Sequence, residues 1–106
     1  MDDQDVLLHR TIATISQSDP LIKLLEQVRL GRMNRADPGL RVIIGSWLAT
    51  YRKAIASSGL TKQALRRLDP SPRLELLRQE GMLPSDDAEA RALIDDFKQA
   101  VEGAPI

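Results

Sequence analysis

The sequence contains no cysteine, a single histidine and only three aromatic residues. The lack of thiols excludes disulfides, cysteine-ligated zinc and iron–sulfur clusters. His9 stands alone, so the chain offers neither a histidine-based triad nor a multi-histidine metal site. A glycine-rich phosphate loop is also missing, because Gly31 and Gly39 are too far apart and neither follows a strand pattern. We therefore expect a protein that is not an enzyme and holds no cofactor and no metal.

Long apolar stretches are absent as well. No apolar run exceeds three residues, as in 6–8 and 42–44, whereas a membrane-spanning helix needs about 20. The chain begins with Asp2, Asp3 and Asp5, the opposite of the positively charged start of a secretory signal. These features predict a cytoplasmic protein without a membrane partner.

What is present is typical of one small globular protein. The 106 residues are 42% hydrophobic and 28% charged, which argues against wholesale disorder. A chain of this length makes one domain of ordinary size. We expect a single helical domain over residues 1–106, with frayed termini at 1–4 and 103–106.

The turn signals of the sequence are those of helices. Asp-Pro pairs at 19–20, 37–38 and 69–70 combine a helix N-cap with a proline suited to the first turn, and Thr61 and Ser85 are further N-cap candidates. Four glycines occur where helices should stop: Gly31, Gly59, Gly81 and Gly103. Between these signals, apolar residues recur with the helical period. The predicted helices span 3–16, 20–30, 38–57, 62–68, 72–80 and 86–102.

This pattern predicts an all-α fold, a compact bundle of five to six helices around one long central helix at about 38–57. No segment alternates with period two beside hairpin turn residues, so no strand is expected. No internal repeat is apparent.

Charge is segregated along the chain although its formal net value is zero. Residues 28–80 hold eleven basic and four acidic side chains. Residues 1–27 hold two basic and five acidic side chains, and residues 81–106 hold two basic and six acidic side chains. In one interpretation the acidic ends neutralise the basic middle within the chain or across a dimer. In the other, the basic middle binds nucleic acid or an acidic protein.

The basic segment suggests particular binding residues. Arg29, Arg32 and Arg35 are spaced by three and would share a face if the helix before them extended, and Arg41 follows on the next helix. Guanidinium groups bind carboxylate and phosphate equally well. With Arg66 and Arg67, these four are the candidate contacts for a partner or for nucleic acid; the alternative is a solvated basic turn.

Part of the segment at about 51–80 is similar in sequence to a known motif. Its residues Ser-Gly-Leu-Thr-Lys-Gln-Ala-Leu, at 58–65, are similar to the opening of many bacterial helix-turn-helix regulators. The resemblance implies a DNA-reading helix next along the chain. That segment departs from the pattern, because it is short and carries Glu75 and Glu80, which would oppose phosphates.

Two aromatic residues, Trp47 and Tyr51, lie one helical turn apart. They are core residues or, alternatively, exposed anchors for a partner. The acidic residues at 86–96 lack the glycine turn and alternation of a calcium loop, so no metal site is predicted. We expect a small regulatory or adaptor protein that binds a protein partner or itself, as a dimer; the alternative is a nucleic-acid-binding regulator.

Overall fold

The computed structural model describes residues 3–18 and 20–106. Helix accounts for 72% of the described residues, and these residues contain no strand, so the prediction of an all-α fold is confirmed. These residues form α1 (Asp3–Ser18), α2 (Leu21–Arg29), α3 (Pro38–Ala56), α4 (Lys62–Arg66), α5 (Ser71–Gln79) and α6 (Ala88–Gly103).

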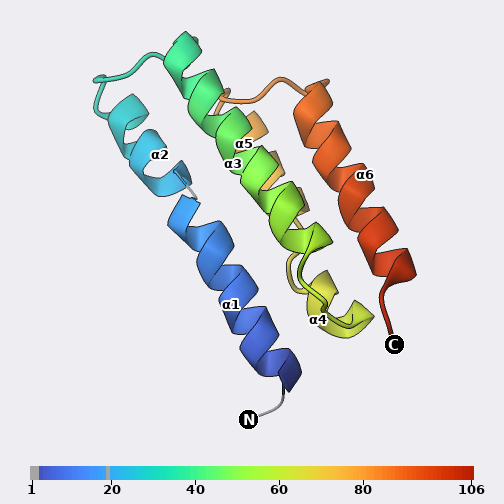
Figure 1. The fold of residues 1–106 in the computed structure, drawn as a ribbon. Helices are drawn as coiled ribbons and strands as arrows, with labels where there is room; N and C mark the ends of the chain where they lie inside the picture. The colour runs from blue at the N-terminus through green and yellow to red at the C-terminus, as the bar shows by residue number, and fades with distance from the viewer. Residues whose placement is uncertain (1–2, 19) are drawn as a thin grey trace.

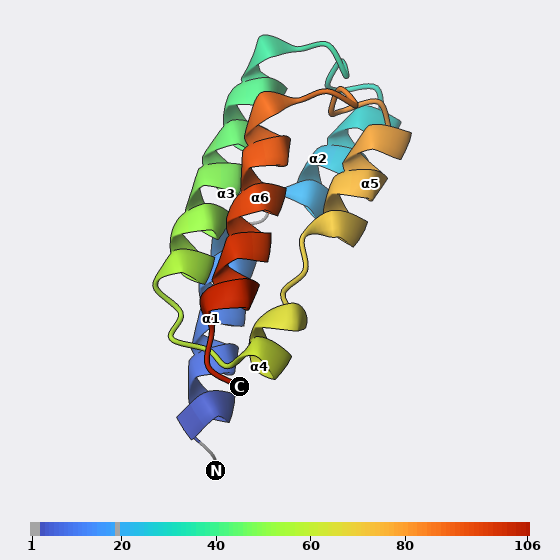
Figure 2. The same cartoon turned by 90° about the vertical axis from the view of Figure 1, so that its right-hand side faces the viewer.

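The longest helices lie side by side. α3 contacts α1 on one side and α6 on the other, and α4 lies at the ends of α1 and α6 (Figure 1). Seen from the side, α2 and α5 lie together on one side of α3 and α6, to the right of them in Figure 2. The loops after α2 and after α5 meet at one end of the molecule, which we call the loop end. α4 and both chain termini lie at the other end (Figure 1).

The core is formed by the apolar face of each helix. α3 contributes seven buried residues, among them Leu40, Ile44 and Trp47, because its apolar residues recur at spacings of three and four. Leu74 and Leu77 of α5 and Leu93 of α6 complete the buried centre. Leucine supplies most of the remaining buried side chains, which suits a chain with so few aromatic residues.

Several helix ends differ from the sequence prediction. α6 begins at Ala88 rather than 86, and its N-cap is Asp87 rather than Ser85: the Ala90 backbone N–H donates to Asp87 Oδ1 at 2.9 Å. α5 begins one residue early, at Ser71, whose N–H donates to the Asp69 carboxylate at 2.9 Å. Gly103 is the last residue of α6 and does not end it with a positive φ. The predicted Asp19 cap lies outside the described residues.

The structure contradicts the absence of an internal repeat. The segments 20–56 and 70–106 are two copies of one helix–loop–helix unit, offset by fifty residues. Equivalent residues are identical at seven positions: Pro20 and Pro70, Leu24 and Leu74, Gly31 and Gly81, Asp37 and Asp87, Arg41 and Arg91, Ile44 and Ile94, Ala54 and Ala104.

The two loops share the backbone hydrogen bonds that end the helix before them. Gly31 and Gly81 have φ values of 73° and 74°, a left-handed conformation that glycine adopts without strain. In both units the glycine N–H donates to a backbone carbonyl of the preceding helix, that of Val28 at 3.1 Å and that of Arg78 at 3.0 Å. The N–H of the residue after each glycine donates to the carbonyl one residue further back, which completes a Schellman motif. The repeat was missed because identical residues are scattered and the surface charges of the units have diverged.

Candidate functional site

The predicted ridge of arginines at 29, 32 and 35 does not form. α2 ends at Arg29, and the left-handed Gly31 stops the helix. Arg32 and Arg35 therefore lie in the loop and not on a shared helical face. The condition for a phosphate-binding ridge, an extension of α2, is not met.

Two of these arginines face a carboxylate of the second unit. Arg29 Nη2 lies 3.1 Å from Glu80 Oε1, and Arg35 Nη2 lies 3.9 Å from Glu80 Oε2. Both guanidiniums are more than half exposed, so each pair contributes about 0–1 kcal/mol. Glu80, which sequence analysis took as a departure from a DNA-binding pattern, is thus a partner for the basic loop.

Arg41 is engaged more deeply. Its Nη2 forms an ion pair with Asp87 Oδ2, and Glu89 Oε2 lies 3.5 Å from the same nitrogen. The Asp87 side chain is only 6% exposed, and its other oxygen caps α6. A buried carboxylate needs such partners to remain charged. Glu89 also lies over Gly45, where an added Cβ would come within 2.9 Å of its oxygen, so glycine there leaves room for the acidic side chain.

Sequence analysis missed Arg52 as a site residue. Its Nε lies 2.6 Å from Asp96 Oδ2 across α3 and α6. Arg52 lies on the same helix as Trp47, but nothing in the sequence shows which acid faces it.

All five ion pairs that described residues form between the two units share one direction. The arginine belongs to 20–56 and the carboxylate to 70–106. The composition of the two units agrees with this direction. The first unit holds seven basic and two acidic side chains, and the second holds four basic and eight acidic side chains. The contact between the units is therefore electrostatically asymmetric.

The remaining candidate arginines lie elsewhere. Arg66 and Arg67 are exposed at α4, at the end of the molecule opposite Arg32 and Arg35 (Figure 1). The six candidate arginines thus do not form one continuous surface.

The helix-turn-helix-like corner is small. α4 has five residues, fewer than the predicted 62–68. α5 buries Leu74 and Leu77 in the core, while Glu75 is exposed and lies 3.8 Å from Arg78. The outward face of α5 therefore pairs acid with base within one helix.

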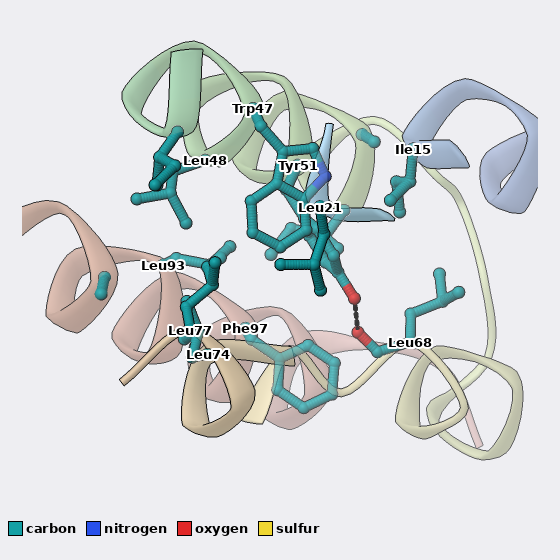
Figure 3. Close-up of a cluster of buried hydrophobic side chains, with 14 of the residues drawn as sticks. Ile15, Leu21, Trp47, Leu48, Tyr51, Leu68, Leu74, Leu77, Leu93 and Phe97 are labelled. Atoms are coloured by element: carbon teal, nitrogen blue, oxygen red, sulfur yellow. Dashed lines mark hydrogen bonds between the residues drawn. The ribbon is translucent and has the colours of Figure 1, made fainter. Parts of the chain in front are cut away.

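Trp47 and Tyr51 are both buried, at 2% and 6% exposure. Their rings meet edge to face with centroids 5.6 Å apart, and the Tyr51 hydroxyl donates to the Leu68 carbonyl (Figure 3). This bond fixes the end of α4 against α3. The Trp47 indole N–H is buried and has no hydrogen-bond partner among the described residues.

The described residues hold no group of three or more histidine, cysteine or carboxylate side chains placed to bind a metal ion. None of their helices is long and apolar enough to cross a membrane.

Comparison of the chain with known protein families, with curated proteins and with solved structures finds no match.

Proposed function

We propose that this protein is a non-enzymatic interaction module, a single helical domain organised around α3 that binds a protein partner or a second copy of itself. The observation that carries the proposal is the pairing of Arg29, Arg41 and Arg52 with carboxylates of the second unit. Guanidiniums that are held by the chain's own acids are less available to phosphates.

The organisation of the bundle supports this interpretation. α3 carries the largest set of buried residues, and both helices beside it contact it directly. A regulator that reads DNA would present a polar helix to the major groove, whereas α5 packs its leucines into the core.

The proposal is tested by measuring nucleic-acid binding and self-association on the same protein. A gel-shift titration uses generic duplex DNA and RNA at about 50 and 200 mM salt. Light scattering measures the mass of the wild type and of the variant that carries Arg32→Glu and Arg35→Glu. We expect no measurable nucleic-acid binding at the higher salt, and a change in self-association or thermal stability in the variant.

Nucleic-acid binding has a distinct signature. The logarithm of affinity would fall with the logarithm of salt by about 0.9 per duplex phosphate neutralised, and the double reversal would weaken binding uniformly across sequences. Submicromolar, salt-sensitive binding of this kind would overturn the proposal and establish the protein as a nucleic-acid-binding regulator.

A further inference from the structure

The turn and helix at residues 61–68, which we call the α4 corner, carry positive charge that forms no ion pair with the described residues. Lys62, Arg66 and Arg67 belong to it, and the segment contains no acidic residue. None of the three forms an ion pair with a described residue. The corner thus differs from the basic residues at 29, 41 and 52, each of which faces a carboxylate.

The α4 corner is held in one orientation. Leu65 and Leu68 are buried, so Arg66 and Arg67 between them project outward. The Thr61 N–H donates to Gln4 Oε1 at 2.9 Å, and the Lys62 N–H donates to the Pro105 carbonyl at 2.8 Å. Segments near both ends of the chain therefore fix the backbone that presents the cations, which lowers the cost of ordering them on binding.

A hollow lies beside these cations. It has a volume of about 400 Å³ and is lined by α1, by the α4 corner and by Ile106, with Leu8, Ala64 and Ile106 as its apolar residues and Arg67 as its basic residue. Asp5 carries the one acidic side chain among these lining residues. The Asp69 carboxylate, just beyond the corner, already accepts the Ser71 N–H. Positive charge therefore dominates the corner.

We propose that the α4 corner binds an acidic segment of a partner protein, with carboxylates on Arg66 and Arg67 and an apolar side chain in the hollow. The argument is charge complementarity together with an apolar seat, a combination that acidic peptides match. Nucleic acid matches it less well. Three cations neutralise about three phosphates, the other candidate arginines are paired or lie at the loop end, and a phosphate backbone leaves the hollow empty.

The inference rests on the proposed function and is tested by fluorescence anisotropy on the full chain. The probe is a labelled peptide with the sequence Glu-Glu-Leu-Glu-Glu twice in tandem. One control peptide has lysine for glutamate, a second has serine for leucine, and a labelled thymidine oligonucleotide of equal length is the nucleic-acid arm. The variant reverses Arg66→Glu and Arg67→Glu. Its matched control reverses Lys23→Glu and Arg91→Glu, which changes the net charge equally at exposed positions away from α4.

We expect the acidic peptide to bind and the lysine peptide not to bind. Reversal at 66 and 67 should weaken acidic-peptide binding by about tenfold or more, and the control reversal by less than about twofold. The serine peptide should bind more weakly than the leucine peptide. Equal loss in the two variants, or no saturable peptide binding, overturns the inference alone. Tight oligonucleotide binding overturns the proposed function as well.

Discussion

Asp87 and Arg41 form an ion pair that joins the N-terminus of α6 to the first turn of α3. The same aspartate caps α6 through the Ala90 N–H. Its equivalent in the first unit, Asp37, caps α3 by accepting the Gly39 N–H at 2.8 Å but is exposed and forms no ion pair with a described residue. Asp37 therefore only caps its own helix, whereas Asp87 caps its helix and also links it to α3.

The repeat makes these two aspartates a matched pair of mutants. Asp37→Ala should lower the free energy of unfolding by about 1 kcal/mol, the usual cost of losing an N-cap. Asp87→Ala should cost about 2–4 kcal/mol, because a charged hydrogen bond is lost with the cap. Urea unfolding followed by circular dichroism measures both. Equal losses would show that the Arg41 pair adds nothing to stability.

The loop glycines provide a second comparison. Gly31→Ala and Gly81→Ala should each destabilise by about 1–2 kcal/mol, because alanine is strained at positive φ. No atom lies within 4 Å of a Cβ added at Gly31, and the Arg35 side chain lies at an ordinary 3.6 Å from one at Gly81, so backbone strain dominates in both. Gly103→Ala, at a helical position, should be neutral or stabilising by up to about 1 kcal/mol. Thermal melts of the three variants check the order, and a destabilised Gly103→Ala would contradict it.

The core depends on its single tryptophan. Trp47→Ala should cost about 3–5 kcal/mol, a large part of the roughly 5–15 kcal/mol that a small domain has. Trp47→Phe keeps an aromatic ring against Tyr51 and removes an N–H that has no partner in the part of the chain that the structure describes, so it should cost less than the alanine variant. Far-ultraviolet circular dichroism against urea measures both. An unchanged midpoint in Trp47→Ala would contradict a core role.

The Arg52–Asp96 pair tests how much an exposed inter-unit contact contributes. Both side chains are about two-fifths exposed, so water and salt screen the pair. A double-mutant cycle with Arg52→Ala and Asp96→Ala should give a coupling of about 0–1 kcal/mol that shrinks at high salt. A coupling energy as large as the difference in unfolding free energy between Asp87→Ala and Asp37→Ala would contradict this. It would show that hydrogen-bond geometry, more than burial, sets the strength of the Arg52–Asp96 pair.

Most of the helices could be predicted from the sequence because their signals are local. Asp37 and Thr61 cap the helices that they precede, and Gly31 ends α2. The start of α6 could not be fixed, because Ser85, Asp86 and Asp87 are all competent caps. The loop hydrogen bonds and Arg41, which lies 46 residues away in the sequence, select the third.

The candidate site was less accessible to sequence analysis. The arginines were identifiable as the residues that bind acids, but their partners depend on how the two units face each other. Glu80 and Asp96 carry no local sign of this. One signal in the sequence could have revealed the repeat, namely a constant spacing of fifty residues. It separates Asp-Pro at 19–20 from Asp-Pro at 69–70, Gly31 from Gly81, and Asp37 from Asp87.

The hydrogen bonds from Thr61 to Gln4 and from Lys62 to Pro105 link α4 to segments that are remote in sequence. A helix of five residues does not persist alone in water. The amide hydrogens of Thr61 and Lys62 exchange with solvent only when these two hydrogen bonds open. We therefore expect their exchange rates to report how often α4 separates from the start of α1 and from the segment after α6.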